Sequence, residues 1–147
     1  MFRKRNGALE VLLVHPGGPF WRNKDAGAWT IPKGEIAEGE DFLARARTEF
    51  QEELGFAPSA DLIELGSVKQ KGGKTVHAWA FEGHLPNDFK LASNTFEMEW
   101  PPRSGHTQAF PEIDRAEFFT IDEAKRKINS AQIPLLERLG DALKQQS

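Results

Sequence analysis

The sequence predicts one domain of the α/β or α+β class, in which a few helices pack against strands as a sandwich. Its 147 residues are about the length of a single domain. Short apolar or alternating segments, typical of strands, are interspersed with amphipathic segments typical of helices. No repeat and no Pro-, Gly- or Ser-rich linker divides the chain. The domain is therefore expected to span residues 1–147.

The composition excludes several classes of site. Hydrophobic residues make up 39% and charged residues 28% of the chain, as in ordinary globular proteins. The absence of cysteine excludes disulfides, thiolate metal sites and cysteine nucleophiles. A net charge of −3 without a long basic run makes a nucleic-acid partner unfavourable. If the ligand is a polyphosphate, this acidic protein needs a cation to bind it.

The N-terminal segment carries no export or membrane signal. Residues 1–5 are basic, but no apolar export segment follows them. The longest apolar run, residues 11–14, is far too short to cross a membrane. We therefore expect a cytoplasmic protein with no membrane contact.

The first half of the chain begins with a hairpin and leads to a helix. Residues 8–14 read as a buried strand, and Asn6-Gly7 is a hairpin-turn signal that pairs it with residues 1–4. A loop rich in Pro and Gly covers residues 15–28. A short strand over residues 29–31 ends at Pro32. The expected helix covers residues 40–54, and Gly55 follows as its stop signal.

The second half contains further strands and two helices. Two alternating segments flank Gly72-Gly73 and predict a hairpin. All the strands expected in this half are residues 61–70, 74–83, 95–100 and 117–120. Helices are expected over residues 122–129 and 134–145, and the apolar stripe of the last one is Leu135, Leu136, Leu139 and Leu143.

The helix over residues 40–54 places glutamates beside its apolar stripe. At about 100° per residue, Leu43, Ala46, Phe50 and Leu54 fall within an arc of roughly 80° that faces a core. Glu49, Glu52 and Glu53 occupy an adjoining arc of about 100°. Like charges at these spacings oppose helix formation.

A divalent cation would remove that conflict. Hard cations such as Mg²⁺ take carboxylate oxygens as ligands. Gly34, in the turn before the helix, would let a backbone carbonyl approach the same ion. The alternative is a solvated acidic face, which is common on surface helices.

Residues 34–56 resemble the Nudix box, G-x5-E-x7-R-E-U-x-E-E-x-G-U, where U is a bulky apolar residue. Each fixed position matches except one, where Thr48 stands in place of the arginine. Residues 29–34 are also similar to the strand that leads into that box.

The resemblance implies an α/β/α sandwich around a mixed central sheet and a Mg²⁺- or Mn²⁺-dependent hydrolase of nucleoside diphosphates linked to another group. Glu49, Glu52 and Glu53 would bind the metal, together with the Gly34 carbonyl, and Glu40 would assist from the start of the helix.

The threonine at position 48 puts part of this assignment in question. In the family, the arginine orients the box carboxylates through an ion pair. Arg45 lies one helical turn before Glu49, and our hypothesis is that it supplies part of that orientation. The alternatives are an ordinary surface arginine, and a weakened site in a domain that mostly binds.

Pyrophosphate cleavage also needs a base that activates water. A carboxylate left free of metal could serve, and the candidates are Glu52 or Glu53 in the helix. Glu112 lies where some members of the family place a loop acid before the last strand, and the alternative is a surface loop residue.

Cationic and aromatic residues outside the helix are candidates for substrate binding. Lys33, Lys71, Lys74 and Arg103 could hold phosphate oxygens. Phe20 and Trp21 lie in the Pro- and Gly-rich loop and could stack on a nucleobase. Each of these also has an ordinary structural or solvated explanation.

The sequence thus predicts a cytoplasmic pyrophosphohydrolase of the Nudix type that acts on a small nucleotide. Dinucleoside polyphosphates such as diadenosine tetraphosphate are the first expectation, followed by nucleoside triphosphates. The alternative is a non-catalytic, nucleotide-sensing domain. Removal of RNA caps is disfavoured because the sequence shows no basic track for a polynucleotide.

Overall fold

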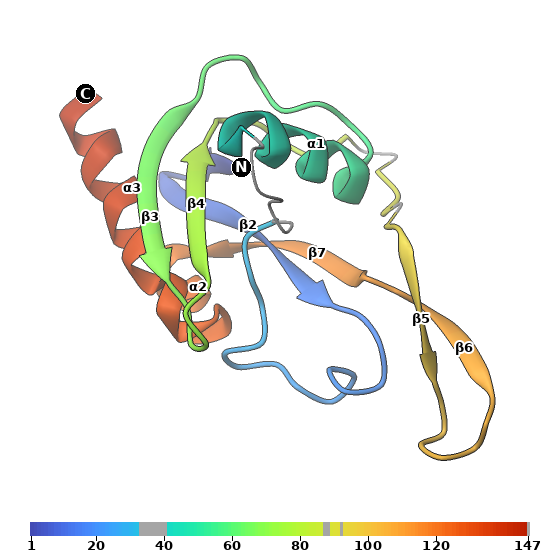
Figure 1. The fold of residues 1–147 in the computed structure, drawn as a ribbon. Helices are drawn as coiled ribbons and strands as arrows, with labels where there is room; N and C mark the ends of the chain where they lie inside the picture. Colours follow the sequence, from blue (N-terminus) through green and yellow to red (C-terminus); the bar gives the residue numbers. More distant parts are fainter. Residues whose placement is uncertain (33–40, 87–88, 92, 147) are drawn as a thin grey trace.

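The structure is a computed structural model that describes residues 1–32, 41–86, 89–91 and 93–146. Its strands are β1 (Phe2–Arg5), β2 (Ala8–Pro16), β3 (Ile63–Lys69), β4 (Thr75–Ala80), β5 (Thr95–Glu99), β6 (Thr107–Pro111) and β7 (Ile113–Thr120). Its helices are α1 (Phe42–Leu54), α2 (Ile121–Lys127) and α3 (Ile133–Gln146), with a short 3₁₀ turn η1 (Ser130–Gln132) before α3 (Figure 1).

The central sheet is antiparallel, with the strand order β1-β2-β7. Asn6 and Gly7 take positive φ angles of 53° and 79° in the β1–β2 turn, as the Asn-Gly pair predicts. Strand β2 then pairs with β7 along most of its length, from Glu10 opposite Thr120 to His15 opposite Arg115. The expected first strand pair is confirmed.

The remaining strands form two separate antiparallel hairpins, β3–β4 and β5–β6. Parallel pairing among the described residues is limited to the isolated bridges Phe2 to Glu82 and Trp29 to Ile128. The expected strand over residues 29–31 also contributes only isolated bridges, the second of them antiparallel between Thr30 and Val14. The sheet is therefore mixed, as expected, only through the two isolated parallel bridges.

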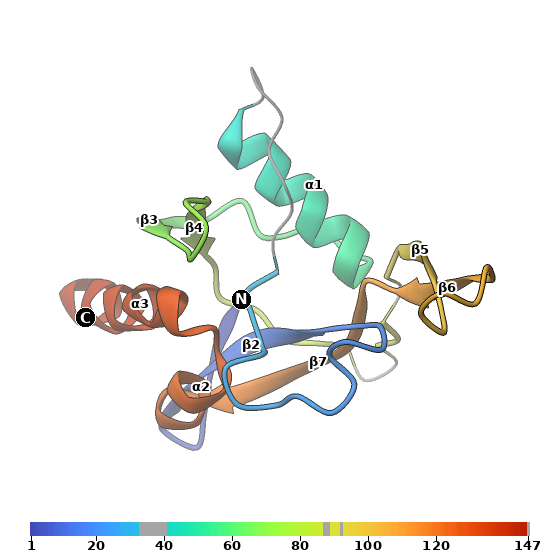
Figure 2. The same cartoon turned by 60° about the horizontal axis from the view of Figure 1, so that its bottom comes forward.

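Both faces of β2 are buried, which explains its uninterrupted apolar run. Val11 and Leu13 belong to a core cluster with residues of α2 and α3, among them Ala124 and Leu136. Leu12 and Val14 belong to a second cluster with Phe50 and Leu54 of α1. The sheet thus lies between α1 and the C-terminal helices (Figure 2), and the expected sandwich is confirmed.

Helix α1 begins slightly later than the sequence predicts. The Asp41 side chain accepts a hydrogen bond from the Leu43 N–H at 3.1 Å and caps the first turn. Gly55 ends the helix in the left-handed conformation at φ 83°, as predicted. Glu40, expected as the first helical residue, lies outside the described residues.

The sequence did not predict β6, and it assigned only residues 117–120 of β7. Four of the five residues of β6 are exposed, so this strand has almost no apolar alternation to detect. The β5–β6 hairpin projects away from the body of the molecule (Figure 1). None of the helices in the described residues is long and apolar enough to cross a membrane.

Candidate active site

Helix α1 carries the three glutamates of the motif in two different environments. Glu49 and Glu53 are one turn apart and only 8% and 7% exposed. Glu52 lies between them in the sequence and is exposed. Phe50 and Leu54 pack against the sheet, so the neighbouring residues Glu49 and Glu53 lie at the edge of the core. Burial of a carboxylate is costly unless a cation or hydrogen bonds compensate it.

Arg45 forms an ion pair with Glu49 across one turn of the helix, between Nη2 and Oε1. The Thr48 hydroxyl donates to the backbone carbonyl of Ala44 at 3.0 Å, which is a hydrogen bond within helix α1. The contact that the sequence hypothesis requires of Arg45 is therefore present. That Arg45 orients this carboxylate in place of the usual arginine stays a prediction.

The donor set on this helix fits a hard divalent cation, because carboxylate oxygens are the ligands that Mg²⁺ and Mn²⁺ prefer. In the described parts of the chain, no three His, Cys, Asp or Glu side chains are close enough together to hold one ion. Gly34, Glu40 and Lys33 lie outside those parts. The metal site over residues 34–53 stays a prediction, and Glu49 and Glu53 are its buried members.

Glu112 lies in the bend between β6 and β7 and is exposed. Its N–H donates to the Asn94 carbonyl at 2.8 Å, and its carbonyl accepts from the Gly17 N–H at 2.9 Å. These bonds fix the backbone at the end of β2 but leave the carboxylate at the surface. Its assignment as a base stays a prediction.

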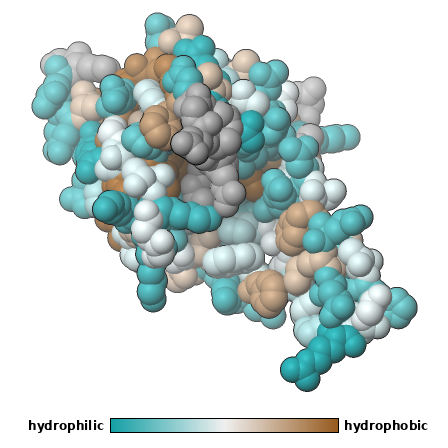
Figure 3. Space-filling view, in the orientation of Figure 1, coloured by the Kyte–Doolittle hydropathy of each residue, from teal (hydrophilic) through white to brown (hydrophobic). Residues whose placement is uncertain are grey.

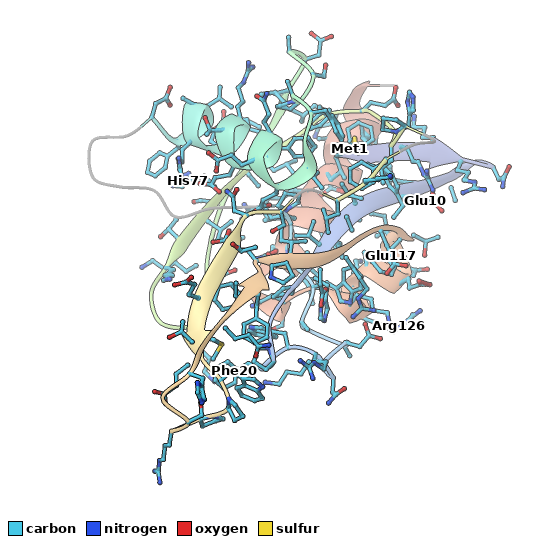
Figure 4. The ribbon with its side chains drawn as sticks, turned by 90° about the vertical axis from the view of Figure 1, so that its right-hand side faces the viewer. Met1, Glu10, Phe20, His77, Glu117 and Arg126 are labelled. Carbon is cyan, nitrogen blue, oxygen red and sulfur yellow. The ribbon has the colours of Figure 1, made fainter. Side chains whose placement is uncertain are left out.

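Of the aromatic candidates, Phe20 lies beside the β5–β6 hairpin, away from α1 (Figure 4). Phe20 is 64% and Trp21 39% exposed. The Phe20 ring meets Trp100 edge to face, with 6.5 Å between ring centroids. The space-filling view shows apolar surface at this place among hydrophilic side chains (Figure 3). Trp100, which the sequence left open between base contact and core packing, thus packs against Phe20. We call Phe20, its sequence neighbour Trp21 and Trp100 the aromatic cluster.

The predicted phosphate-binding cations do not gather in one place. Lys71 and Lys74 are exposed in the β3–β4 turn. Arg103 lies in the turn of the other hairpin, where its N–H donates to Glu99 Oε1 at 2.7 Å. The two hairpins lie on opposite sides of the molecule in both ribbon views (Figures 1 and 2). A single phosphate chain could therefore contact both the lysines and Arg103 only if it were long.

His15 fixes the Pro- and Gly-rich loop, a role that the sequence did not specify. Its ring is fully buried, with Nδ1 2.8 Å from Asp114 Oδ1 and Nε2 2.7 Å from the Lys24 carbonyl. Farther along the loop, Asp25 accepts from Trp29 Nε1 at 2.7 Å and forms an ion pair with Lys127. These contacts lower the pKa of Asp25, the Lys127 bond most strongly.

An apolar cavity of about 90 Å³ lies between α1, the β3–β4 hairpin and α3. Leu43, Ala46 and Phe50 line it from α1, and Leu135 lines it from α3. Neither Glu49 nor Glu53 contributes to its wall. Arg47 and His77 are its polar lining residues, so most of its wall is apolar.

A model of the NUDIX domain matches residues 1–139. The chain belongs to the NUDIX family. The match confirms the family that residues 34–56 indicate and the expected enzyme class, a Nudix-type pyrophosphohydrolase acting on acid anhydrides. A search of curated proteins gave no match.

Several solved structures share the fold. A C. elegans Ap4A hydrolase in a binary complex is 21% identical, covers 98% of this chain and 94% of its own, and gives a TM-score of 0.68. The NUDIX domain of Shewanella oneidensis NrtR, complexed with ADP ribose, is 14% identical over 97% and 82%, with a TM-score of 0.64. A MutT protein from Methanosarcina mazei Go1 is 18% identical over 97% and 91%, at 0.59. At these identities the likeness shows the fold alone.

The Arg45 contact predicts a specific effect on metal use. Arg45→Ala should raise the Mg²⁺ concentration for half-maximal hydrolysis and lower kcat about tenfold, because Glu49 loses the group that orients it. Steady-state rates over a magnesium series measure both. Arg47→Ala, an exposed arginine on the same helix, is the matched control. Unchanged turnover and metal affinity in Arg45→Ala would dismiss the role.

The Asp25 contacts predict a pH-dependent stabilisation of the loop. Asp25→Asn should lower the Tm at pH 7, because Lys127 loses its ionic partner. Since the pKa of Asp25 is lowered from its ordinary value of 3.8, this contribution is present above that pH. It is lost as the pH falls through the lowered pKa. Thermal melts from pH 7 to about pH 3 should show the difference from wild type shrinking. The control is Glu137→Gln, at an exposed position of α3, and an equal Tm loss in it at pH 7 would contradict the assignment.

Proposed function

We propose that this chain is a Mg²⁺- or Mn²⁺-dependent pyrophosphohydrolase that cleaves phosphoanhydride bonds in nucleoside diphosphate-linked substrates. Dinucleoside polyphosphates such as diadenosine tetraphosphate are the first candidates, and nucleoside triphosphates the second. The observation that carries the proposal is the acidic face of α1, where buried Glu49 is paired with Arg45 inside the Nudix motif. We place the reaction in the cytoplasm, with a small nucleotide as the partner.

The residues that would hold the cation are Glu49, Glu52 and Glu53, with the carbonyl of Gly34 as a further ligand. A bound divalent cation supplies charge neutralisation on the phosphates and a more nucleophilic water. The ion pair with Arg45 limits the rotamers of Glu49, so less ordering remains to be done when the ligand binds. Glu40 would assist from the residue before the Asp41 cap.

The proton of the attacking water needs a carboxylate that does not bind the metal, and Glu52 or Glu53 could serve only if that residue is left out of the metal ligands. Glu52 is exposed and Glu53 is buried, so they differ in access to the solvent while they share one helix face. Glu112 is the candidate from outside the helix. Single Glu→Gln variants at the three positions separate these roles, since loss of a base changes the pH profile of kcat.

The aromatic cluster favours a substrate with a base far from the cleaved bond. Phe20 and Trp21 expose ring surface, and stacking of a base on such rings contributes about 1–3 kcal/mol. Lys24 Nζ lies 5.1 Å from the Trp21 ring centroid, which adds a cation beside the ring. Lys33, Lys71, Lys74 and Arg103 are the proposed phosphate contacts. A dinucleoside polyphosphate is long enough to suit these widely separated aromatic and cationic residues. The C. elegans neighbour is an Ap4A hydrolase.

A nucleotide panel tests the proposed activity. With millimolar Mg²⁺, the wild-type protein should release phosphorylated nucleoside products from diadenosine tetraphosphate and nucleoside triphosphates. Glu52→Gln should lose about a hundredfold in kcat, because the site loses a carboxylate charge. Glu137→Gln, exposed on α3, is the matched control and should keep full activity. Saturable nucleotide binding without turnover on any substrate would instead favour the nucleotide-sensing domain.

The aromatic cluster predicts a change in KM. Phe20→Ala should raise the KM for diadenosine tetraphosphate about tenfold, since the second base loses a stacking surface, and leave kcat nearly unchanged. The KM for inorganic tripolyphosphate, which has no base, should stay the same. Phe42→Ala removes another exposed ring and serves as the control. Equal KM changes for both substrates would refute base stacking at Phe20.

A further inference from the structure

His15 is a fully buried ring whose two nitrogens both face oxygen atoms. Nδ1 lies 2.8 Å from Asp114 Oδ1, and Nε2 lies 2.7 Å from the backbone carbonyl oxygen of Lys24. Neither oxygen has a hydrogen to donate, because a carboxylate and a backbone carbonyl are acceptors only. Both ring nitrogens must therefore donate, and only the protonated imidazolium carries a hydrogen on each of them.

A neutral His15 would lose one of these two bonds. Each neutral tautomer has a hydrogen on one nitrogen and a lone pair on the other. A hydrogen bond to an ionised partner is stronger than one between neutral groups, so the neutral ring keeps its hydrogen on Nδ1, toward Asp114. The lone pair of Nε2 then faces the Lys24 carbonyl, and two acceptors repel each other. Loss of the proton therefore releases Lys24.

Lys24 connects His15 to the aromatic part of the Pro- and Gly-rich loop. Its N–H donates to the Trp21 carbonyl at 3.0 Å, and its Nζ lies 5.1 Å from the Trp21 ring centroid. The Trp21 N–H in turn donates to the Gly18 carbonyl at 3.3 Å. The bond from His15 to Lys24 therefore determines where Trp21 lies relative to β2.

The two ends of the loop are held by bonds that do not titrate. At the start, the Gly17 N–H donates to the Glu112 carbonyl at 2.9 Å. At the end, the N–H groups of Gly27 and Trp29 donate to carbonyls at the end of α2, at 3.2 and 3.0 Å. Loss of the Lys24 bond would therefore loosen the middle of the loop and leave both ends attached.

The charged groups near the His15 ring come from β7, the loop and α2. Asp114 is in direct contact with the ring, and Arg115 Nε lies 3.7 Å from the same carboxylate oxygen. The Arg115 guanidinium also lies 5.0 Å from the centroid of the Trp29 ring, which meets His15 edge to face. Asp114 thus favours the imidazolium at contact distance, and Arg115 opposes it. The other charges have partners of their own, and they are Asp25 with Lys127 and Lys24 over Trp21.

We propose that His15 is a positioning residue that couples binding of a nucleobase to protonation. The imidazolium holds Lys24, and with it Trp21, in place, whereas the neutral ring releases them. Binding to an ordered loop costs less entropy than binding to a mobile one. The affinity for the base should therefore fall as the pH rises through the range in which histidine loses its proton, ordinarily about pH 6.5. The inference rests on the proposed function in that the ligand is the nucleobase of its substrate.

The first test follows the ring and the loop in one titration. Nitrogen-15 NMR reports which ring nitrogens of His15 carry a hydrogen, and relaxation gives the order parameters of the Trp21 and Lys24 amides. Between about pH 5.5 and about pH 8.5, we expect two protonated nitrogens to become one, with both order parameters falling in parallel. Ring protonation that stays constant over this range, or loop order that does not follow it, would overturn the inference.

Asp114→Asn tests the coupling without altering the buried ring. The new amide can donate to Nδ1, so a neutral His15 keeps its hydrogen on Nε2 and its bond to Lys24. The loop of this variant should stay ordered over the whole pH range. His84→Gln, which replaces an exposed histidine, is the matched control and should follow the wild type. A wild-type pH dependence of loop order in Asp114→Asn would contradict the inference.

Adenosine is the binding probe, because it carries a base and has no phosphate that titrates. Its affinity for the wild type should fall about fivefold from the acidic to the basic end of the range, as expected for the loss of one hydrogen bond. For Asp114→Asn the affinity should stay within about twofold. Wild-type affinity that is independent of pH, or no adenosine binding in a protein that hydrolyses nucleotides, would overturn the inference and leave the proposed reaction in place. The expected pattern in a protein without hydrolase activity would support His15 and remove the proposed reaction.

Discussion

The placement of α1 against a strand that is buried on both faces is the constraint on which the rest of the structure depends. Leu12 and Val14 of β2 accept Phe50 and Leu54, and this contact fixes the rotation of the helix. That rotation places Glu49 and Glu53 at the edge of the core, where burial of a carboxylate is unfavourable unless a cation or hydrogen bonds compensate it. The proposed cation site would therefore depend on packing as much as on the charges themselves.

Two polar networks fix the loops on the other elements of the fold. The first, around His15 and Asp25, ties the loop after β2 to β7 and α2. The second, around Gln132, ties the segment before the motif to the β3–β4 turn. Each contains one fully buried polar side chain, His15 or Gln132, with hydrogen-bond partners, an arrangement that specifies one geometry more strictly than apolar packing does. The loops proposed to contact a nucleotide are therefore attached to a fixed frame.

Sequence reasoning succeeded where a local pattern had a local cause. The Asn6-Gly7 turn, the buried strand β2, the end of α1 at Gly55 and the contact of Arg45 with Glu49 all follow from spacings of four residues or fewer. It failed where the partner is distant or the strand is exposed. Nothing local marks β6, and Gln132 and Ile31 are separated by about a hundred residues. The metal ligands were predicted from the spacing of Glu49, Glu52 and Glu53 on one helix face, together with resemblance to a motif, and they stay a prediction.

The central claim is that the glutamates of α1 hold a divalent cation for phosphoanhydride cleavage. Titration of Mn²⁺, followed by electron paramagnetic resonance with a nucleotide present, measures this most directly. We predict saturable binding at millimolar Mn²⁺ or below in the wild-type protein. Glu53→Gln should weaken it about tenfold or more, and Glu137→Gln should not change it. Failure of the wild type to bind any ion at these concentrations, or equal binding by Glu53→Gln, would contradict the account.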